Sequence, residues 1–287
     1  MSNSSKSKCQ RCNNTKIEVI PQGRFAKAIQ CSQCFTHCQS CDDLGYILNK
    51  DNQGREVATK CSCQIIQHRI GLFNKAGIPS HFYDATYENF NTAYDSSLAE
   101  ALHQVKFLPK NFEKGIWKGL LFMGGVGVGK TRLVSSMIRD FTLNHNIPCL
   151  FKEFSTLLSE IKSGYDKGLS ESLILDQISK VDILVIDELG KGRKTDWEIS
   201  ILDIIISSRY NMRNTTVFTT NYTDKPSTTY RETSLVKSPD EGTKEIIKRE
   251  TLEQRVYSRI YSRLKEMAHF VELRGGDHRQ PAEEIFA

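Results

Sequence analysis

The chain has 287 residues, of which 39% are hydrophobic and 25% are charged, and it carries a formal net charge of +5. This length allows about two domains, and the ordinary charged fraction argues against disorder throughout. The mild positive charge permits a nucleic-acid partner without requiring one. No apolar run approaches the roughly 18 residues of a membrane span. The first residues lack the apolar core of a secretory signal, so we expect a cytoplasmic protein without a membrane segment.

Three regions follow one another: a cysteine-rich segment at residues 1–70, a connector at 71–115, and a third region at 116–287. In the third region, apolar patterns predict strands at 119–123, 148–151, 182–186, 215–219 and 269–273. They predict helices at 131–145, 154–162, 170–180, 196–212 and 246–267, with a polar loop at 222–243. Strands that alternate with helices predict an α/β fold, in which helices cover both faces of a parallel sheet.

Eight of the nine cysteines lie near the start of the chain: Cys9, Cys12, Cys31, Cys34, Cys38, Cys41, Cys61 and Cys63. In a reduced cytosolic chain, such closely spaced pairs act as metal ligands rather than disulfides. Two four-cysteine sets predict two zinc ions, whose pairing is sequential or interleaved; one zinc with four idle thiols is the alternative. Zinc must help this segment fold, because it has few aliphatic residues. We expect His37 to be a bystander and Cys149 to be core.

A glycine-rich segment between the predicted strand at 119–123 and the helix at 131–145 fits the P-loop pattern. Its backbone N–H groups and helix N-terminus favour phosphate, which predicts ATP binding. We expect Lys130 to reach the β- and γ-phosphate oxygens and Thr131 to ligate Mg²⁺. The expected nucleotide-binding residues here are Gly124, Gly125, Val126, Gly127, Val128, Gly129, Lys130, Thr131 and Arg132.

Two further predicted strands end in polar residues. The strand at 182–186 leads to Asp187 and Glu188, which suit a Mg²⁺ ligand and a base that polarises water. Two adjacent carboxylates favour hydrolysis over transfer to a small acceptor, because a kinase must keep water out. The strand at 215–219 leads to Asn221, which we expect to contact the γ-phosphate or the attacking water; a plain turn residue is the alternative.

These stretches resemble the AAA+ ATPases, and more narrowly the DnaC/DnaI-type replicative helicase loaders and the related IstB-type transposition ATPases. The resemblance runs from about residue 77 to residue 279. It rests on GIPSHFYDATYENF, GLLFMGGVGVGKTRL, VDILVIDELG, DWEISILDIIISSRYN, VFTTNY and RVYSRIYSRLKEMAHFVELRGGDHR. It implies that Lys130 and Thr131 are the Walker A pair, Asp187 and Glu188 the Walker B pair, and Asn221 the γ-phosphate sensor.

The resemblance also implies roles for arginines near the end of the chain. Either Arg259 or Arg263 matches the arginine finger, which reaches the nucleotide of a neighbouring subunit; Arg255 is a further candidate. The three recur every four residues and so are expected to share one helical face. Arg279 matches a family position to which no role is assigned. Because few residues follow it, we expect an ATPase domain without the helical lid of many AAA+ proteins.

As a function, the resemblance implies an ATPase that loads a hexameric replicative helicase onto single-stranded DNA. It implies a homo-oligomer when ATP is bound, and a zinc domain at 1–70 that docks the helicase. An IstB-type ATPase assisting a transposase is the first alternative. A P-loop kinase of a small metabolite and a zinc adaptor that uses ATP only as a switch are the others, and Glu188 argues against both.

Overall fold

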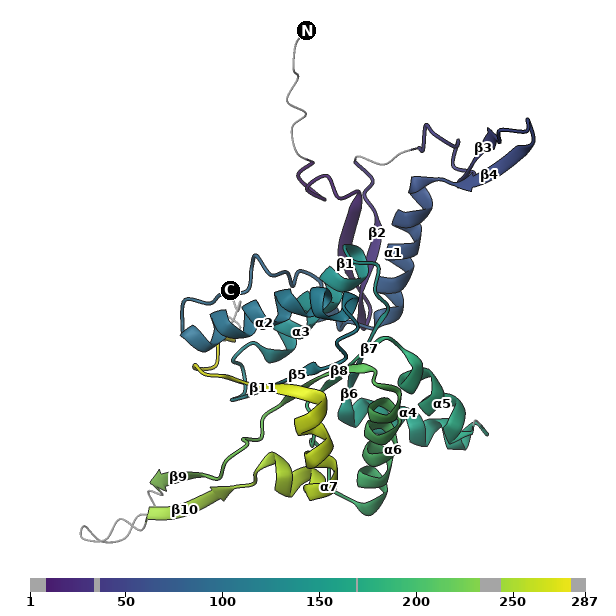
Figure 1. The fold of residues 1–287 in the computed structure, drawn as a ribbon. Helices are drawn as coiled ribbons and strands as arrows, with labels where there is room; N and C mark the ends of the chain where they lie inside the picture. Colours follow the sequence, from purple (N-terminus) through teal and green to yellow (C-terminus); the bar gives the residue numbers. More distant parts are fainter. Residues whose placement is uncertain (1–8, 34–36, 169, 233–243, 280–287) are drawn as a thin grey trace. The chain divides into compact units, whose positions relative to one another are not determined.

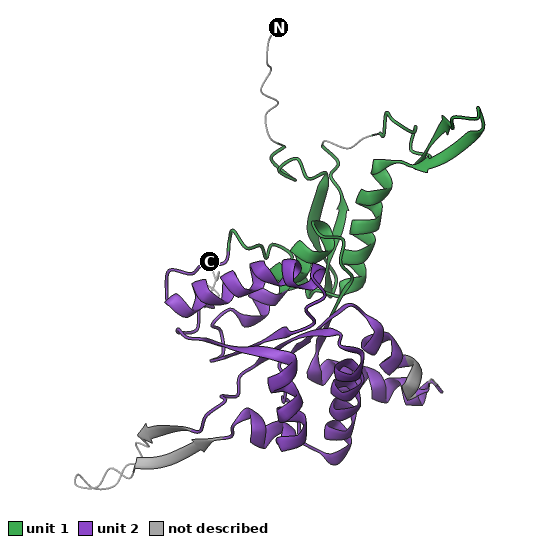
Figure 2. Cartoon of the chain, in the orientation of Figure 1, with its two compact units in different colours: residues 1–89, 135–150 green, residues 90–134, 151–287 purple. Residues whose placement is uncertain are grey.

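The structure, a computed structural model, describes residues 9–33, 37–168, 170–232 and 244–279 (Figure 1). The chain forms two compact units (Figure 2): residues 1–89 with 135–150, and residues 90–134 with 151–287. The first unit therefore extends past residue 70. None of the helices that the structure describes has the length and apolar character needed to cross a membrane.

The first unit contains two antiparallel hairpins and a helix. The two strands of the first hairpin are joined through Gly23, whose φ of +59° suits a two-residue hairpin turn. The side chain of Asn74 binds this hairpin, since its Oδ1 accepts from the Ala28 N–H at 2.7 Å and its Nδ2 donates to the Ala28 carbonyl at 3.0 Å. The elements are β1 (Ile17–Gln22), β2 (Phe25–Gln30), β3 (Tyr46–Lys50), β4 (Glu56–Lys60), α1 (Ser62–Ala76) and the 3-10 helix η1 (Ser80–Phe82).

The rest of the chain builds a five-stranded sheet with the order β11-β5-β8-β7-β6. The pairs β11–β5, β5–β8 and β8–β7 are parallel. Figure 1 shows α2 on one side of this sheet and α6 and α7 on the other. The elements are α2 (Ser96–Glu113), β5 (Gly119–Gly124), α3 (Lys130–Leu143), β6 (Cys149–Glu153), α4 (Phe154–Asp166), α5 (Glu171–Lys180), β7 (Ile183–Asp187), α6 (Asp196–Met212), β8 (Thr215–Thr220), β9 (Ser227–Glu232), β10 (Lys244–Arg249), α7 (Leu252–Met267) and β11 (Ala268–Leu273).

The predicted α/β fold with a parallel sheet is confirmed, and the predicted strands lie within a few residues of β5, β6, β7, β8 and β11. The inner strands β5, β7 and β8 are almost wholly buried, which explains their continuous apolar character. β8 lies between β5 and β7, so the ends of these three strands meet at one edge of the sheet.

Two predictions near the end of the chain were wrong. The helix predicted to begin at Ile246 begins at Leu252, and the predicted loop contains β9, which pairs with β10. Antiparallel pairing of Ile246 and Ile247 with β9 replaces the helical conformation there. The true start carries a capping box, in which Thr251 and Gln254 bind one another's backbone N–H groups. Residues 233–243 of the predicted loop lie outside the described residues.

The largest wholly buried side chain is a cation, Arg209 of α6, at 0% exposure. Its guanidinium donates to the Thr216 hydroxyl at 2.8 Å and to a ring of backbone carbonyls. Burial lowers the pKa of Arg209 to about 9, opposed by Asp182. The arginine thereby joins the end of α5 to the starts of β7 and β8. The carbonyls belong to Ile178, Ser179, Val181, Asp182 and Thr215.

Arg209→Met should therefore destabilise the fold strongly. It leaves several buried carbonyls without a donor, and each such group costs about 1–3 kcal/mol. We expect a loss of at least ~3 kcal/mol in urea unfolding, against about 0.5 kcal/mol or less for the exposed Lys180→Met control. Equal unfolding midpoints for the two variants would contradict the structural role of Arg209.

Candidate functional site

The predicted P-loop joins the end of β5 to the start of α3. Gly124, Gly127 and Gly129 all have positive φ, and a Cβ at Gly124 would collide with the Leu273 carbonyl of β11. Glycine is therefore required where the loop passes so close to other backbone. Val126 is exposed at the loop, whereas Val128 is buried. Gly125 and Arg132 lie in the loop and in the first turn of α3, as predicted.

Lys130 lies in the hollow of this loop and is 7% exposed. Its ammonium donates to the carbonyls of Gly124 at 2.9 Å and Gly125 at 2.6 Å. Burial lowers the pKa of Lys130 to about 8, while Asp187 and Glu188 oppose that shift. A phosphate placed here would offer this buried cation full counter-charge, which the two neutral carbonyls do not.

Asp187, at the end of β7, meets Thr131 at the start of α3. The Thr131 hydroxyl lies 3.1 and 3.2 Å from the two carboxylate oxygens. A second hydroxyl, that of Thr219 on β8, donates to Asp187 Oδ1 at 2.6 Å. Burial raises the pKa of Asp187, and both hydroxyl hydrogen bonds oppose the rise. A carboxylate beside a threonine hydroxyl is an oxygen-rich pair of the kind that Mg²⁺ prefers.

Glu188 follows in a left-handed conformation, with φ of +56°. Such a conformation costs roughly 1–2 kcal/mol for a residue other than glycine. The end of β8 holds it, since the Glu188 N–H donates to Thr219 Oγ1 at 3.0 Å and the Leu189 N–H donates to the Thr219 carbonyl at 2.7 Å. The Glu188 carboxylate is bound by Lys191, whose ammonium also lies 3.5 Å from Glu153 at the end of β6.

Asn221 follows β8 directly and is exposed at the same edge of the sheet. The register sets Thr220 opposite Met123 of β5, so Asn221 lies level with Gly124, the last residue of the P-loop strand. Its role as a sensor stays a prediction. Sequence analysis missed Thr219, Lys191 and Glu153; the run of two threonines before Asn221 was the only signal for the first of them.

The arginines of α7 divide into two groups. Arg259 and Arg263 both bind Asp203 of α6, at 2.9 and 2.8 Å, and their side chains are 71% and 28% exposed. Arg255 instead binds backbone within its own unit. The expected common face does not form, because Tyr257, with φ of +64° and ψ of 151°, interrupts the helix between Arg255 and Arg259.

The segment after β11 lies on the P-loop. The His278 N–H donates to the Gly127 carbonyl at 3.2 Å, and a Cβ at Gly127 would collide with the Asp277 carboxylate. The His278 ring stacks on Tyr94 with 4.2 Å between centroids. Arg279 is exposed, and its guanidinium lies 4.0 Å from the Asp277 carboxylate. Its positive charge adds a small contribution to the lowering of the Lys130 pKa.

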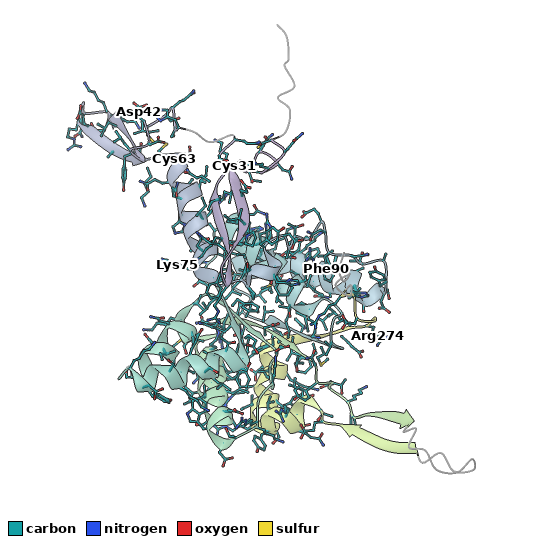
Figure 3. The ribbon with its side chains drawn as sticks, turned by 180° about the vertical axis from the view of Figure 1, so that it is seen from behind. Cys31, Asp42, Cys63, Lys75, Phe90 and Arg274 are labelled. Atoms are coloured by element: carbon teal, nitrogen blue, oxygen red, sulfur yellow. The ribbon has the colours of Figure 1, made fainter. Side chains whose placement is uncertain are left out.

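The described cysteines between residues 9 and 63 form two clusters, and Figure 3 labels one member of each, Cys31 and Cys63. The sulfur–sulfur distances are 3.6 Å for Cys38–Cys61, 3.5 Å for Cys41–Cys63 and 3.8 Å for Cys9–Cys31. A zinc tetrahedron with 2.3 Å bonds has an edge of roughly 3.8 Å, so the spacing fits zinc. The clusters are Cys38, Cys41, Cys61 and Cys63, and Cys9, Cys12 and Cys31; Cys34 lies outside the described residues.

This grouping follows the chain sequentially rather than interleaved. The backbone N–H of Cys63 lowers the pKa of Cys61 to about 7. Burial raises the pKa of Cys41, and the Gly45 N–H, which donates to the Cys41 sulfur at 3.2 Å, opposes that rise. Both contacts favour a thiolate. His37 has its two ring nitrogens on Asp42 and Asp43, at 3.2 and 2.9 Å, which leaves it no role as a ligand in this arrangement. Cys149 is buried in β6.

Purified protein should contain two zinc ions per chain. Removal of zinc with a strong chelator should unfold the two cysteine clusters while the ATPase-like sheet keeps its structure, because the clusters have few apolar side chains. Elemental analysis and far-ultraviolet circular dichroism before and after chelation measure both effects. Less than one zinc per chain after metal-replete expression would contradict the prediction.

Residues 72–235 match the family described as IstB-like ATP binding protein. The chain is 27% identical over 150 residues to the replicative helicase loader DnaC of Escherichia coli (strain K12), covering 52% of this chain and 60% of that protein. It is 24% identical over 227 residues to the replicative helicase loader DnaI of Bacillus subtilis (strain 168), covering 73% and 68%. The chain thus matches about 60% of the length of its DnaC relatives.

Solved structures agree with this placement. The crystal structure of the DnaC helicase loader superimposes with a TM-score of 0.53 at 26% identity, covering 68% of this chain and 99% of that one. The crystal structure of DnaI, at 22% identity, shares the fold with a TM-score of 0.50, covering 70% and 94%. The α/β core is therefore of the AAA+ P-loop type, as predicted. Because the family match covers more than half of the chain, this protein belongs to the IstB-like ATP binding protein family.

Proposed function

We propose that this protein is an ATPase that loads a hexameric replicative helicase onto single-stranded DNA. The observation that carries the proposal is the meeting of Lys130, Thr131, Asp187 and Glu188 at one edge of the sheet, in a chain similar to DnaC and DnaI. Reduced thiols at two zinc sites suit a protein of the cytoplasm.

ATP binds with its phosphates in the P-loop. The Lys130 ammonium exchanges the Gly124 and Gly125 carbonyls for β- and γ-phosphate oxygens. Thr131 and Asp187 would hold Mg²⁺, which neutralises phosphate charge when bound. Glu188 accepts the proton of the attacking water, and Asn221 orients that water against the γ-phosphate.

The arginine finger completes this site from a neighbouring subunit in an ATP-bound homo-oligomer. Arg259 suits this role better than Arg263, because 71% of its side chain is exposed and a single carboxylate, Asp203, holds it. Arg263 is 28% exposed and donates to both Asp203 and Ser207. An arginine finger must leave its partner in its own subunit to reach another subunit. Breaking the more exposed ion pair costs less free energy, because solvent already screens it.

The zinc-binding region at 1–70 docks the helicase. In β3, Ile47 packs on the Cys38–Cys63 cluster, so the alternating Tyr46 and Leu48 lie on the opposite face. Their side chains, together with Leu44, are 47%, 67% and 77% exposed. Neighbouring exposed apolar side chains on a small metal-stabilised ribbon are typical of a protein–protein contact. This face has no nucleotide-binding residue, so docking does not depend on ATP.

The kinase alternative fits less well, because Glu188 lies beside Asp187 at the phosphate end of the site, where it activates water. An ATPase that assists a transposase is the second candidate, because the chain matches the family of IstB-like ATP binding proteins. The helicase is favoured because the curated relatives reported above are both helicase loaders. The two candidates differ in the partner that the exposed β3 face should bind.

Lys130→Ala should abolish binding of a fluorescent ATP analogue, since it removes the buried cation of the phosphate site. Glu188→Gln should keep that binding and lower ATP turnover at least ~100-fold, because an amide does not take a proton from water. Lys180→Met is the surface control and should match the wild type in both assays. Turnover at the wild-type rate in Glu188→Gln would show that another group is the base.

Leu48→Asp should weaken binding of the full chain to the host replicative helicase without changing ATP turnover, because it places a charge on the apolar face. Asn49→Asp adds the same charge on the opposite face of the same strand and should bind normally. Pull-down with and without ATP measures this.

Single-stranded DNA binding is a separate prediction. It should require a non-hydrolysable ATP analogue and should weaken as the salt concentration rises, because the contacts are mainly to phosphates. Anisotropy of labelled oligo-dT measures both effects.

If the protein binds a transposase instead of the helicase, and if Leu48→Asp weakens that binding, the protein is an ATPase that assists a transposase. DNA binding that ignores nucleotide would remove the expected link between the ATP site and the DNA.

A further inference from the structure

Arg255 packs against a backbone turn, and little of its side chain is exposed. Its side chain is 13% exposed. Its Nε donates to the Gly190 carbonyl at 2.6 Å, and its Nη2 donates to the Gly192 carbonyl. Its guanidinium also lies over the Tyr222 ring, 5.5 Å from the centroid, and 3.4 Å from the Glu250 carboxylate. Arg255 therefore clamps two carbonyls of one turn.

That turn, Glu188–Gly192, begins at the proposed base and is under conformational constraint. Glu188, Gly190 and Gly192 have φ values of +56°, +85° and +154°. Hydrogen bonds from the end of β8 hold the beginning of the turn at Glu188 and Leu189. A Cβ at Gly190 would fall 2.8 Å from Arg255 Cγ, so the arginine packs directly on the glycine. Thr219 of β8 thus holds the beginning of the turn, and Arg255 of α7 holds its end.

The same turn carries the cation that binds the base. Lys191 binds the Glu188 carboxylate and lies 3.5 Å from Glu153. The backbone position of Lys191 is set by its neighbours Gly190 and Gly192, whose carbonyls Arg255 holds. Arg255 therefore holds the backbone on both sides of Lys191, the residue whose ammonium binds the Glu188 carboxylate.

The helix that carries Arg255 also carries the proposed finger. Thr251 caps its start, and the Leu252 N–H donates to the Thr223 carbonyl at 2.9 Å, which fixes Arg255 relative to the end of β8. The interruption at Tyr257 then separates Arg255 from Arg259. One arginine binds within the chain, and the other is mostly exposed.

We propose that Arg255 is a positioning residue for Glu188, which acts in the same subunit by fixing the turn Glu188–Gly192 from the start of α7. Helix α7 thereby links the base of one site to Arg259, which serves the neighbouring site. This inference rests on the proposed ATPase function. It differs from a finger role for Arg255, because the effect is confined to the subunit that carries the change.

Arg255→Met should lower kcat about 10- to 100-fold, since a misplacement of about 1 Å at a catalytic group can cost 100-fold. Its affinity for a fluorescent ATP analogue should stay within about 2-fold of wild type, because the P-loop is untouched. Arg255→Lys, which can hold one carbonyl but not two, should lose less. The matched control is Arg274→Met, which changes an exposed arginine that follows β11 and pairs with Glu272 of that strand.

Mixing experiments separate positioning from finger action. Lys130→Ala protein supplies a finger but has no working P-loop, so it should restore activity to Arg259→Ala, whose own site is otherwise intact. It should not restore Arg255→Met, because the defect lies in that subunit's own base. Restoration of Arg255→Met to the level of Arg259→Ala, or an unchanged kcat, would overturn the proposal.

Hydrogen exchange tests the turn without any use of ATPase activity. Arg255→Met should speed exchange of peptides that span 188–192 and leave P-loop peptides unchanged. Equal exchange at 188–192 would overturn the proposal even if the protein has another function. Wild-type turnover in Glu188→Gln with faster exchange at 188–192 would instead overturn the assignment of the base, and leave the clamp standing. If Arg255→Met fails to fold, Arg255→Lys carries the same measurements.

Discussion

The buried carboxylate of Asp187 is the constraint on which the site depends. It is 4% exposed, and a buried carboxylate is tolerated only when donors surround it. Thr131 and Thr219 supply those donors from the first turn of α3 and from β8. The three elements are therefore fixed together before any ligand binds. Because the same threonine of β8 also accepts from the Glu188 N–H, this hydrogen-bonded group also positions the turn Glu188–Gly192.

Helix α7 shows how one short segment gives different partners to side chains of the same charge. Its helical conformation is interrupted at Tyr257, and the interruption divides a predicted stripe of arginines into two groups with different partners. Arg255 donates to two backbone carbonyls of the turn Glu188–Gly192, whereas Arg259 and Arg263 bind Asp203 of α6. Charged side chains at helical spacing do not share a task unless the helix between them is continuous.

The cysteine-rich region differs from the α/β core in how little apolar surface it buries. Its hairpins are short and much of β3 and β4 is exposed, so apolar burial alone provides little stability. Cysteine clusters with the edge lengths of a zinc tetrahedron lie where a larger domain has its apolar core. An outward face on β3 is thereby free to carry apolar side chains such as Leu48, which a conventional small domain would bury.

The sequence by itself determined the parts that are local patterns: the P-loop before α3, the Asp187–Glu188 pair after an apolar strand, the cysteine pairs and the alternation of strands and helices. Even the true start of α7 was readable from Thr251 and Gln254. Only the tertiary structure decided that β8 lies between β5 and β7, that Arg209 is buried, and that Arg255 holds Gly190. These contacts join residues far apart in the chain, and no local spacing encodes which strand ends meet. Hydrogen bonding of buried polar groups selects those partners, and it acts only once the sheet has formed.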